Sequence, residues 1–434
     1  MTSFSVAPPA SQRRPAPAPP LAPRRILFVD DDELILRSME RVLRRPAAES
    51  GWELCFATDG EAALAELARA PVEVMLVDAN MAKMSGAALL KLVQEREPAV
   101  VRILLSGHTG LDILRSALPY AHQFLPKPCD GQLLRSTIES ACRLRGLLAR
   151  PEMRQLVGGS NELPSAPRTY IELSNALANP GASSRAVTDI VERDIGISAR
   201  VLQLVSSAFY GLPRAVTSIG GAVAYLGVEV IKAIVLSVEV SRMFPLTQSI
   251  PDFSVDALQQ HGTRVSQLAK RILGHEPGGD VLMVAGLLQD SGQLVLASRA
   301  APRFASALDI AASRKQPLAQ VEAELFGATH AEIGAYLLGL WGLPQRVVTA
   351  VAYHLEPQRG GSRVFDAAAA LYVANLLLID PDLPALEEIP ARTLALDLAF
   401  LRHVGVAHQL DEWRRLARAF SPGKSAAPRL AARA

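Results

Sequence analysis

The sequence predicts two domains of different class: a doubly wound α/β domain with a five-stranded parallel sheet, followed by an all-α domain. Up to about residue 148, short apolar runs rich in β-branched residues alternate with amphipathic stretches, as strands and helices do in a parallel sheet. After about residue 168 the strand-like runs stop, and apolar residues recur at three- and four-residue spacing. A chain of 434 residues has room for two or three domains.

The predicted strands of the first domain are 26–29, 52–56, 72–78, 100–105 and 123–125. A helix is expected over 33–44, where apolar residues fall at helical spacing. Asp130 is a good N-cap for the last helix, which we expect to run on to about Arg150.

Polar side chains follow four of these strands. Asp30-Asp31-Asp32 follow the first, Asp78 ends the third, Ser106 follows the fourth and Lys127 follows the fifth. Parallel strands place their carboxyl ends at one edge of the sheet, so these groups should meet. Clustered carboxylates repel one another unless a hard cation is present, and Mg²⁺ prefers oxygen ligands. The pattern therefore predicts a site for a divalent cation and a phosphoryl group.

Charge and position suggest a role for each group. We expect Asp78 to accept the phosphoryl group, because a carboxylate can do so when metal and positive charge hold that group in line. Lys127 would pair with the phosphoryl oxygens, the Ser106 hydroxyl would move to bond the acylphosphate, and Lys127-Pro128 is a candidate cis peptide. The expected Mg²⁺ ligands are the carboxylates of Asp30, Asp31 and Asp78 and the main-chain carbonyl of Asn80.

Residues 24–148 resemble the receiver domain of two-component response regulators. The resemblance rests on Asp30-Asp31, Asp78, Ser106 and Lys127-Pro128 in that order, with Phe124 at the position of the aromatic switch. It implies a flavodoxin-like fold, Mg²⁺ as cofactor, and phosphorylation by a sensor histidine kinase or a phosphotransfer protein. One departure is Ala82, where the family often has proline, and it concerns loop shape rather than the chemistry.

Composition narrows the class of protein. Hydrophobic residues make up 49% of the chain and charged residues 20%, which is typical of a soluble globular protein. The formal net charge of +2 is too small to indicate nucleic acid or an anionic membrane as the main partner. The apolar run 222–240 is interrupted by Glu229, Lys232 and Glu239, so we expect a buried helix there. Three cysteines without metal-like spacing fit a reducing cytoplasm.

The second half should be helical. Helices are expected over 169–178, 184–194, 198–208, 218–226 and 228–244, with a further set from 255 to about 420. The Pro-, Ala- and Ser-rich residues 1–23 and the last residues, 421–434, are expected to be unstructured tails. The predicted domain limits are a receiver-like domain over 24–148, a linker over 149–164, a helical domain over 165–380 and a helical extension over 381–420.

Histidines on this helical set raise the question of a second active site. Two or more histidines beside a His-Asp step on packed helices would make a metal-dependent phosphohydrolase site. Each histidine alone is more often a core or cap residue. The candidate positions are His261, Gln289, Asp290, His330, His354 and Asn375.

Residues 165–380 resemble an HDOD domain, a module related to HD-type phosphohydrolases. The resemblance is carried by 195–210, 217–227, 285–292 and 330–344. In the hydrolytic relatives the Gln289-Asp290 step is His-Asp, a lysine commonly stands where this chain has Gln293, and an aspartate sits near Asn375. Glutamine is a weak neutral ligand, so we expect this domain to bind no cofactor and to act as an interaction module, as HDOD domains generally do.

These patterns favour a cytoplasmic response regulator that signals by binding an unknown downstream protein, with a homodimer as a further option. The alternative is a receiver-controlled, metal-dependent phosphodiesterase that acts on a cyclic dinucleotide. A DNA-binding regulator is a third class, but no separate helix-turn-helix tail can be recognised and the charge gives no phosphate-binding footprint.

Overall fold

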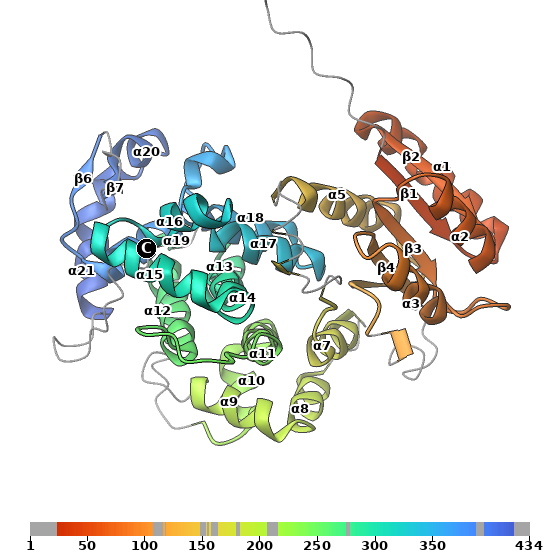
Figure 1. Cartoon of the computed structure of the whole chain (residues 1–434). Helices are drawn as coiled ribbons and strands as arrows, with labels where there is room; N and C mark the ends of the chain where they lie inside the picture. Colours follow the sequence, from red (N-terminus) through yellow and green to blue (C-terminus); the bar gives the residue numbers. More distant parts are fainter. Residues whose placement is uncertain are drawn as a thin grey trace, which may run out of the picture.

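The computed structural model describes residues 24–106, 116–117, 119–147, 153, 156–157, 164–178, 183–205, 216–274, 278–387 and 395–420. The expected tails, 1–23 and 421–434, and most of the expected linker lie outside these residues. The sheet domain and the helical domain lie side by side, with α5 between them (Figure 1).

The first domain is a five-stranded parallel sheet with the strand order β2-β1-β3-β4-β5. The strands are β1 (Arg24–Val29), β2 (Trp52–Ala57), β3 (Val74–Asp78), β4 (Val101–Ser106) and β5 (Gln123–Pro126). The order reverses between β1 and β3, so the carboxyl ends of these two strands form the crevice where open α/β sheets place their sites. The predicted fold class of this domain is confirmed.

Helices cover both faces of the sheet. They are α1 (Glu33–Ser50), α2 (Gly60–Arg69), α3 (Gly86–Arg96) and α5 (Gly131–Leu147). Alternate residues of each strand point to opposite faces, so Ile26 and Phe28 join the core under α1 and α5, whereas Leu27 and Val29 join the core under α2 and α3. The side-chain oxygen of Asp130 accepts a hydrogen bond from Leu133 N at 2.7 Å, which confirms the predicted N-cap of α5.

Helix α1 runs six residues past its expected end at Arg44. Pro46 lies inside the helix and cannot donate a backbone hydrogen bond, while Ala47 in the next position is buried in the core. Burial of this side of the last turn keeps the chain helical until Gly51, whose φ of 68° forms the left-handed C-cap.

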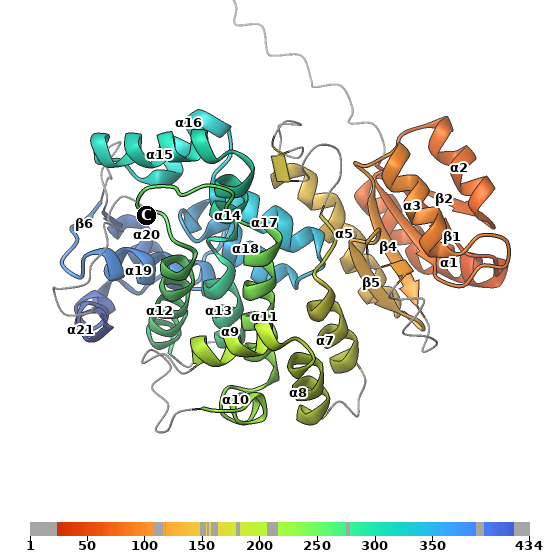
Figure 2. The same ribbon diagram turned by 60° about the horizontal axis from the view of Figure 1, so that its bottom comes forward.

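The second domain is built from helices, as expected. They are α7 (Arg168–Ala178), α8 (Ser184–Glu192), α9 (Ile195–Val205), α10 (Ile219–Leu226), α11 (Val228–Met243), α12 (Val255–Leu273), α13 (Gly279–Leu288), α14 (Ser291–Arg299), α15 (Ala301–Arg314), α16 (Leu318–Phe326), α17 (His330–Leu340), α18 (Gln345–Tyr353) and α19 (Ala367–Ile379). Helix α9 begins three residues before the expected start, because Asp194 Oδ1 accepts from Ile197 N at 2.8 Å and caps it. Figure 2 shows α11, α12 and α13 running side by side through this domain.

The C-terminal extension differs from the expectation that it is helical throughout. A short parallel pair, β6 (Ala385–Leu386) with β7 (Leu396–Asp397), precedes α20 (Leu398–His403) and α21 (Leu410–Phe420). Two 3₁₀ turns, η2 (Pro357–Gly360) and η3 (Ala407–Gln409), complete the set of elements. The pair is anchored because the Tyr372 hydroxyl bonds Ala395 O at 3.3 Å and Asp397 N at 2.9 Å.

Only Val281–Arg299 in the described part of the chain has the length and hydropathy to cross a membrane. Its apolar window is 89% buried, and the run is broken into α13 and α14 at Gln289 and Asp290. The expected buried helix over 222–240 is likewise two elements, α10 and α11, which meet at Gly227. Both runs are core helices.

The two domains share a core. Residues of α1 and α5 on one side of the sheet belong to the same contiguous apolar cluster as those of α17 and α18. Helix α5 packs directly against α17. The contact therefore places the β5 side of the sheet domain against one end of α17.

Candidate functional site

The carboxyl edge of the sheet brings together the side chains that the sequence predicts there. Carboxylate oxygens of Asp30, Asp31 and Asp78 all lie within 4.8 Å of one another. Lys127 Nζ lies 2.6 Å from Asp30 Oδ2 and 2.5 Å from Asp78 Oδ1. Asp30 and Asp78 are buried, whereas Asp31 is exposed. The predicted ligand carboxylates, acceptor and lysine thus occupy one site.

Backbone donors orient these carboxylates. Asp30 Oδ1 accepts from Asp32 N at 3.0 Å, and Asp78 Oδ2 accepts from Asn80 N at 3.0 Å. Asp31 Oδ2 accepts from Ala82 N at 2.9 Å. The second oxygens of Asp30 and Asp78 contact Lys127 Nζ.

The charge of this site suits Mg²⁺. Three carboxylates face one ammonium group, so the cluster carries an excess of two negative charges that a dication would offset. Burial acts to lower the pKa of Lys127, but the hydrogen bonds and charges of Asp30 and Asp78 outweigh it and raise that pKa above its usual value. Lys127 therefore carries a positive charge at neutral pH. The carboxylate oxygens are hard donors of the kind that Mg²⁺ prefers.

The other predicted residues of this edge are also in place. Ser106 ends β4, and its carbonyl accepts from Lys127 N at 2.7 Å. The Lys127-Pro128 peptide is cis, as predicted. Phe124 lies on β5, partly buried against the cores of both sheet faces. Gly86 begins α3 so close to the sheet that a Cβ there would lie 2.3 Å from Asp78 O.

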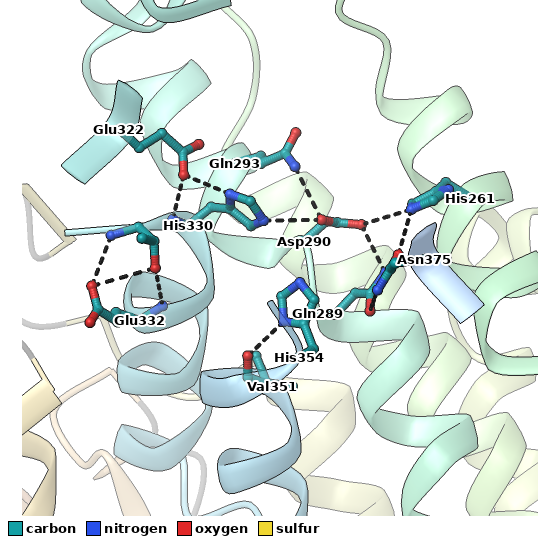
Figure 3. Close-up of polar contacts among 11 residues, drawn as sticks. His261, Gln289, Asp290, Gln293, Glu322, His330, Glu332, Val351, His354 and Asn375 are labelled. Carbon is teal, nitrogen blue, oxygen red and sulfur yellow. Dashed lines mark hydrogen bonds and ion pairs between the residues drawn. The ribbon is translucent and has the colours of Figure 1, made fainter. Parts of the chain in front are cut away.

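A second polar cluster lies in the helical domain, where three of its predicted residues converge (Figure 3). Asp290 stands between α13 and α14, His330 begins α17 and His354 follows α18. One donor atom from each lies within 4.8 Å of the others. His330 Nε2 is 3.5 Å from Asp290 Oδ1. All three residues are buried, with exposed fractions of 8%, 1% and 1%.

The imidazoles of His330 and His354 are each fixed through the Nδ1 atom. His330 Nδ1 lies 2.6 Å from Glu322 Oε2, and His354 Nδ1 lies 2.7 Å from Val351 O. Burial acts to lower the pKa of His330, but the charge and hydrogen bond of Glu322, with the charge of Asp290, raise it above the usual value. Burial, with the charge of His330, lowers the pKa of His354 to about 4. His354 is therefore neutral, with its Nε2 lone pair available.

The remaining predicted residues form a separate half of the cluster. His261 Nε2 lies 3.0 Å from Asn375 Oδ1, on the far side of Asp290 from His330 (Figure 3). Gln289 and Asn375 bond each other through their side-chain amides. His261 is thus held by an amide, and its Nε2 is 4.0 Å from Asp290 Oδ2.

A cavity of about 560 Å³ opens beside His354 and Asn375. Arg359 is on its wall, within 2.8 Å of Glu356 and 3.5 Å of Glu332. Four carboxylates line the cavity against this one guanidinium, namely Glu332, Glu356, Glu387 and Asp397. The cavity is therefore negatively charged.

Sequence reasoning missed two features. Glu322 lies eight residues before His330 on a different helix, α16, and only the fold shows that its carboxylate meets the imidazole. The sequence marks Gln123 only as the first residue of a predicted strand. In the fold, its Nε2 donates to Gly339 O and Leu340 O at 3.1 Å each across the domain contact. An amide in an otherwise apolar strand was the available signal.

Comparison with known families agrees with both halves of this architecture. The family model described as "Response regulator receiver domain" matches residues 26–139, and that of the "HDOD domain" matches residues 163–357. This chain is a response regulator that joins a receiver domain to an HDOD domain. The receiver carries the Asp78 site, and the HDOD domain carries the second cluster.

Similar proteins match parts of this response regulator. An uncharacterized protein of Treponema pallidum is 24% identical over 242 residues, 54% of this chain and 46% of the relative. The DNA-binding transcriptional regulator NtrC of Salmonella typhimurium is 37% identical over 108 residues, 25% of this chain and 22% of its own length. The chain thus spans less than half of either relative. A crystal structure of an HDOD domain protein from Geobacter sulfurreducens is 23% identical, with a TM-score of 0.47, and covers 64% of this chain and 98% of its own.

Proposed function

We propose that the receiver accepts a phosphoryl group on Asp78 from a sensor histidine kinase or a phosphotransfer protein, and that the HDOD domain passes this state on by binding a downstream protein without catalysing a reaction. The observation that carries the proposal is the position of Lys127 Nζ, 2.6 Å from Asp30 and 2.5 Å from Asp78. An ammonium group shared by an acceptor carboxylate and a ligand carboxylate suits phosphoryl transfer.

The transfer itself is simple chemistry. An oxygen of Asp78 attacks the phosphorus, the bond from phosphorus to the donor imidazole nitrogen breaks, and an acylphosphate forms. Asp30, Asp31, Asp78 and the Asn80 carbonyl would hold Mg²⁺, which offsets charge on the phosphoryl oxygens. Lys127 would then turn from the carboxylates to those oxygens, and Ser106 would supply a hydroxyl donor from the end of β4.

The domain contact supports a route for the signal. Phe124 and Lys127 lie on or just after β5, the strand whose Gln123 donates to the last carbonyls of α17. Ser140 Oγ on α5 also donates to Gln345 Oε1 on α18 at 3.0 Å. A rearrangement of β5 and α5 on phosphorylation would therefore act on α17 and α18 first.

The amide pair supports a non-catalytic HDOD domain. The side-chain amides of Gln289 and Asn375 hydrogen-bond each other, and Asn375 also bonds His261. A hydrolytic binuclear site needs charged or imidazole ligands at these positions instead. The acidic wall of the adjacent cavity would also repel a cyclic dinucleotide, which carries two phosphates. The phosphodiesterase alternative is the less favoured function for these two reasons.

The remaining assignments are proposals of the same standing. We assign the receiver to 24–148, a linker to 149–164, the HDOD domain to 165–380 and an extension to 381–420. The protein would work in the cytoplasm, where a histidine kinase can reach the receiver, and a homodimer is a second candidate partner. DNA binding is not proposed, because the net charge of +2 gives no phosphate footprint.

The test is phosphorylation with a small phosphodonor and Mg²⁺. Wild-type protein should be labelled at one acid-stable, base-labile site, and Asp78→Asn should lose the label because an amide cannot form the acylphosphate. Asp189→Asn, an exposed change on α8, is the matched control and should be labelled fully. Full labelling of Asp78→Asn would refute the assignment.

The downstream partner calls for a separate experiment. Phosphodonor-treated wild type and Asp78→Ala should capture different proteins from a native lysate of the source cells. Identical captures would contradict a phosphorylation-dependent interaction.

A further inference from the structure

The cluster in the HDOD domain has the layout of a mononuclear metal site. Its two imidazoles and one carboxylate come from three separate helix ends: Asp290 before α14, His330 at the start of α17 and His354 after α18. Their donor atoms lie within 4.8 Å of one another in a buried position. Metal bonds of about 2.1 Å hold neighbouring donor atoms about 3 to 3.5 Å apart. The separation of His330 Nε2 and Asp290 Oδ1, 3.5 Å, already matches.

The hydrogen-bond partners of the two imidazoles and of the carboxylate also fit a metal site. Metal-binding histidines usually donate their second ring N–H to a carboxylate or a carbonyl, which aims the other nitrogen at the metal. His330 has Glu322 in this place and His354 has Val351 O, so both present Nε2 to Asp290. Asp290 is held in turn, since Gln293 Nε2 donates to its Oδ1 at 3.1 Å. All three donors are therefore fixed from outside the cluster.

Charge points in the same direction. The buried carboxylates Asp290 and Glu322 contact imidazoles and amides, and no lysine or arginine is paired with either among the described residues. Glu322 Oε1 has no hydrogen-bond partner in the described structure. A buried cluster with this much negative charge is stabilised by a dication.

We propose that Asp290, His330 and His354 bind a single divalent transition-metal ion. Of the three ligands, His354 also lines the cavity of about 560 Å³. Imidazole and carboxylate donors suit ions of the Zn²⁺, Fe²⁺ and Mn²⁺ class rather than Mg²⁺. His261, Gln289 and Asn375 stay outside the coordination sphere, because they are bonded to one another. The sequence predicts no cofactor in this domain, since it shows the broken His-Asp step but not the meeting of His330 and His354.

The experiment measures metal retained by the full chain. Purified protein is stripped with a chelator, incubated with Zn²⁺ or Co²⁺ in excess Mg²⁺ to occupy the receiver site, gel-filtered and analysed for metal. Wild type should retain one ion per chain, give visible Co²⁺ absorption bands, and melt at a higher temperature when loaded. His330→Gln and His354→Gln should each lose the retained ion.

Two controls identify the site. His261→Ala should keep the ion, because His261 belongs to the amide half of the cluster. Asp31→Asn removes a receiver carboxylate and should also keep it. Loss of the ion in either control would overturn the ligand assignment.

A further variant covers the case in which the histidine variants fail to fold. Glu322→Gln leaves all three ligands present and should weaken metal affinity about 10- to 100-fold by removing the carboxylate behind His330. Wild-type protein that retains no ion, or unchanged affinity in Glu322→Gln together with full retention in folded histidine variants, would overturn the proposal.

Discussion

Gln289 and Asn375 bond each other twice. Gln289 Nε2 donates to Asn375 Oδ1, and Asn375 Nδ2 donates to Gln289 Oε1, each at 2.9 Å. Both side chains are buried, with exposed fractions of 1% and 6%. A carboxylate has no hydrogen to donate, so this arrangement needs an amide at both positions. The two departures from the hydrolytic pattern therefore support each other.

The amide pair predicts a stability effect. Asn375→Asp should destabilise the fold by about 1 to 3 kcal/mol, because Gln289 Oε1 loses its donor and faces a buried carboxylate. Urea unfolding of both proteins measures this difference. Gln358→Glu is the control, since it makes the same amide-to-acid change at an exposed position and should be near neutral. Equal effects from the two changes would contradict a structural role for the pair.

A second prediction is that the HDOD domain does not hydrolyse cyclic dinucleotides. A binuclear site needs enough strong ligands to hold two metals and a bound hydroxide, and the Gln289, Asn375 and His261 side is closed by amide bonds. The assay measures turnover by the full chain under Mn²⁺, Fe²⁺ and Mg²⁺. Turnover that Asp290→Ala abolishes would show that the enzyme alternative is right.

Lys127 should couple phosphorylation to the rest of the chain. Lys127→Ala should still bind Mg²⁺, because the carboxylate ligands remain, but phosphorylation should no longer change hydrogen exchange over residues 119–128. The control is Lys83→Ala, a change to an exposed lysine paired with Asp59 at 2.8 Å. Lys83→Ala should respond like wild type. An equal response in Lys127→Ala would refute the role given to the ammonium group.

Gln123 should hold the domain contact together. Gln123→Ala removes the donor to two buried carbonyls at the end of α17, at a cost of about 1 to 3 kcal/mol. Amide hydrogens near Gly339 should then exchange faster, as measured by mass spectrometry of peptides from α17. Gln132→Ala, on the exposed side of α5, should leave this exchange unchanged. Indistinguishable exchange in the two variants would show that the contact does not depend on Gln123.

The cysteines predict a pH profile. Cys55 and Cys142 are buried, and Cys129 is half-buried beside Pro128, so a thiol reagent should label one site per folded chain. Burial, with the charge of Asp130, raises the pKa of Cys129 above the usual thiol value. A raised pKa keeps the reactive thiolate scarce at neutral pH, so labelling should still accelerate above pH of about 9, where an ordinary thiol levels off. Cys129→Ser should abolish labelling, and a rate that levels off at about pH 9, as for an ordinary thiol, would contradict the raised pKa.

Local patterns predicted the receiver well. Strand ends, the carboxylates Asp30 and Asp78, and Lys127 are adjacent in the fold because parallel strands share one edge, and that rule applies from sequence alone. The polar cluster of the HDOD domain was harder. His330 and His354 were visible as histidines on helices, but their approach to Asp290 depends on how α14, α17 and α18 cross, and no local period fixes that.

The errors have similar causes. The continuation of α1 past Pro46 and the β6–β7 pair both depend on tertiary packing, on burial of Ala47 in one case and on the Tyr372 hydroxyl in the other. The local helix and strand propensities of the residues predict neither the longer helix nor the strand pair. Glu322 and Gln123 act across helices or across domains, so their partners are not encoded near them in the chain.

Helix α17 has a consequence for how the two sites communicate. His330 starts this helix, and Gly339 and Leu340, whose carbonyls accept from Gln123, end it, so α17 runs about 16 Å from the His330 cluster to the domain contact at the start of β5. If phosphorylation of Asp78 changes metal affinity at His330 by some factor, thermodynamic reciprocity requires the metal to shift the phosphorylation equilibrium of Asp78 by the same factor. The state of the protein would then depend jointly on phosphorylation and on metal binding. A measurement of how phosphorylation changes metal affinity would also give the size of the metal's effect on phosphorylation.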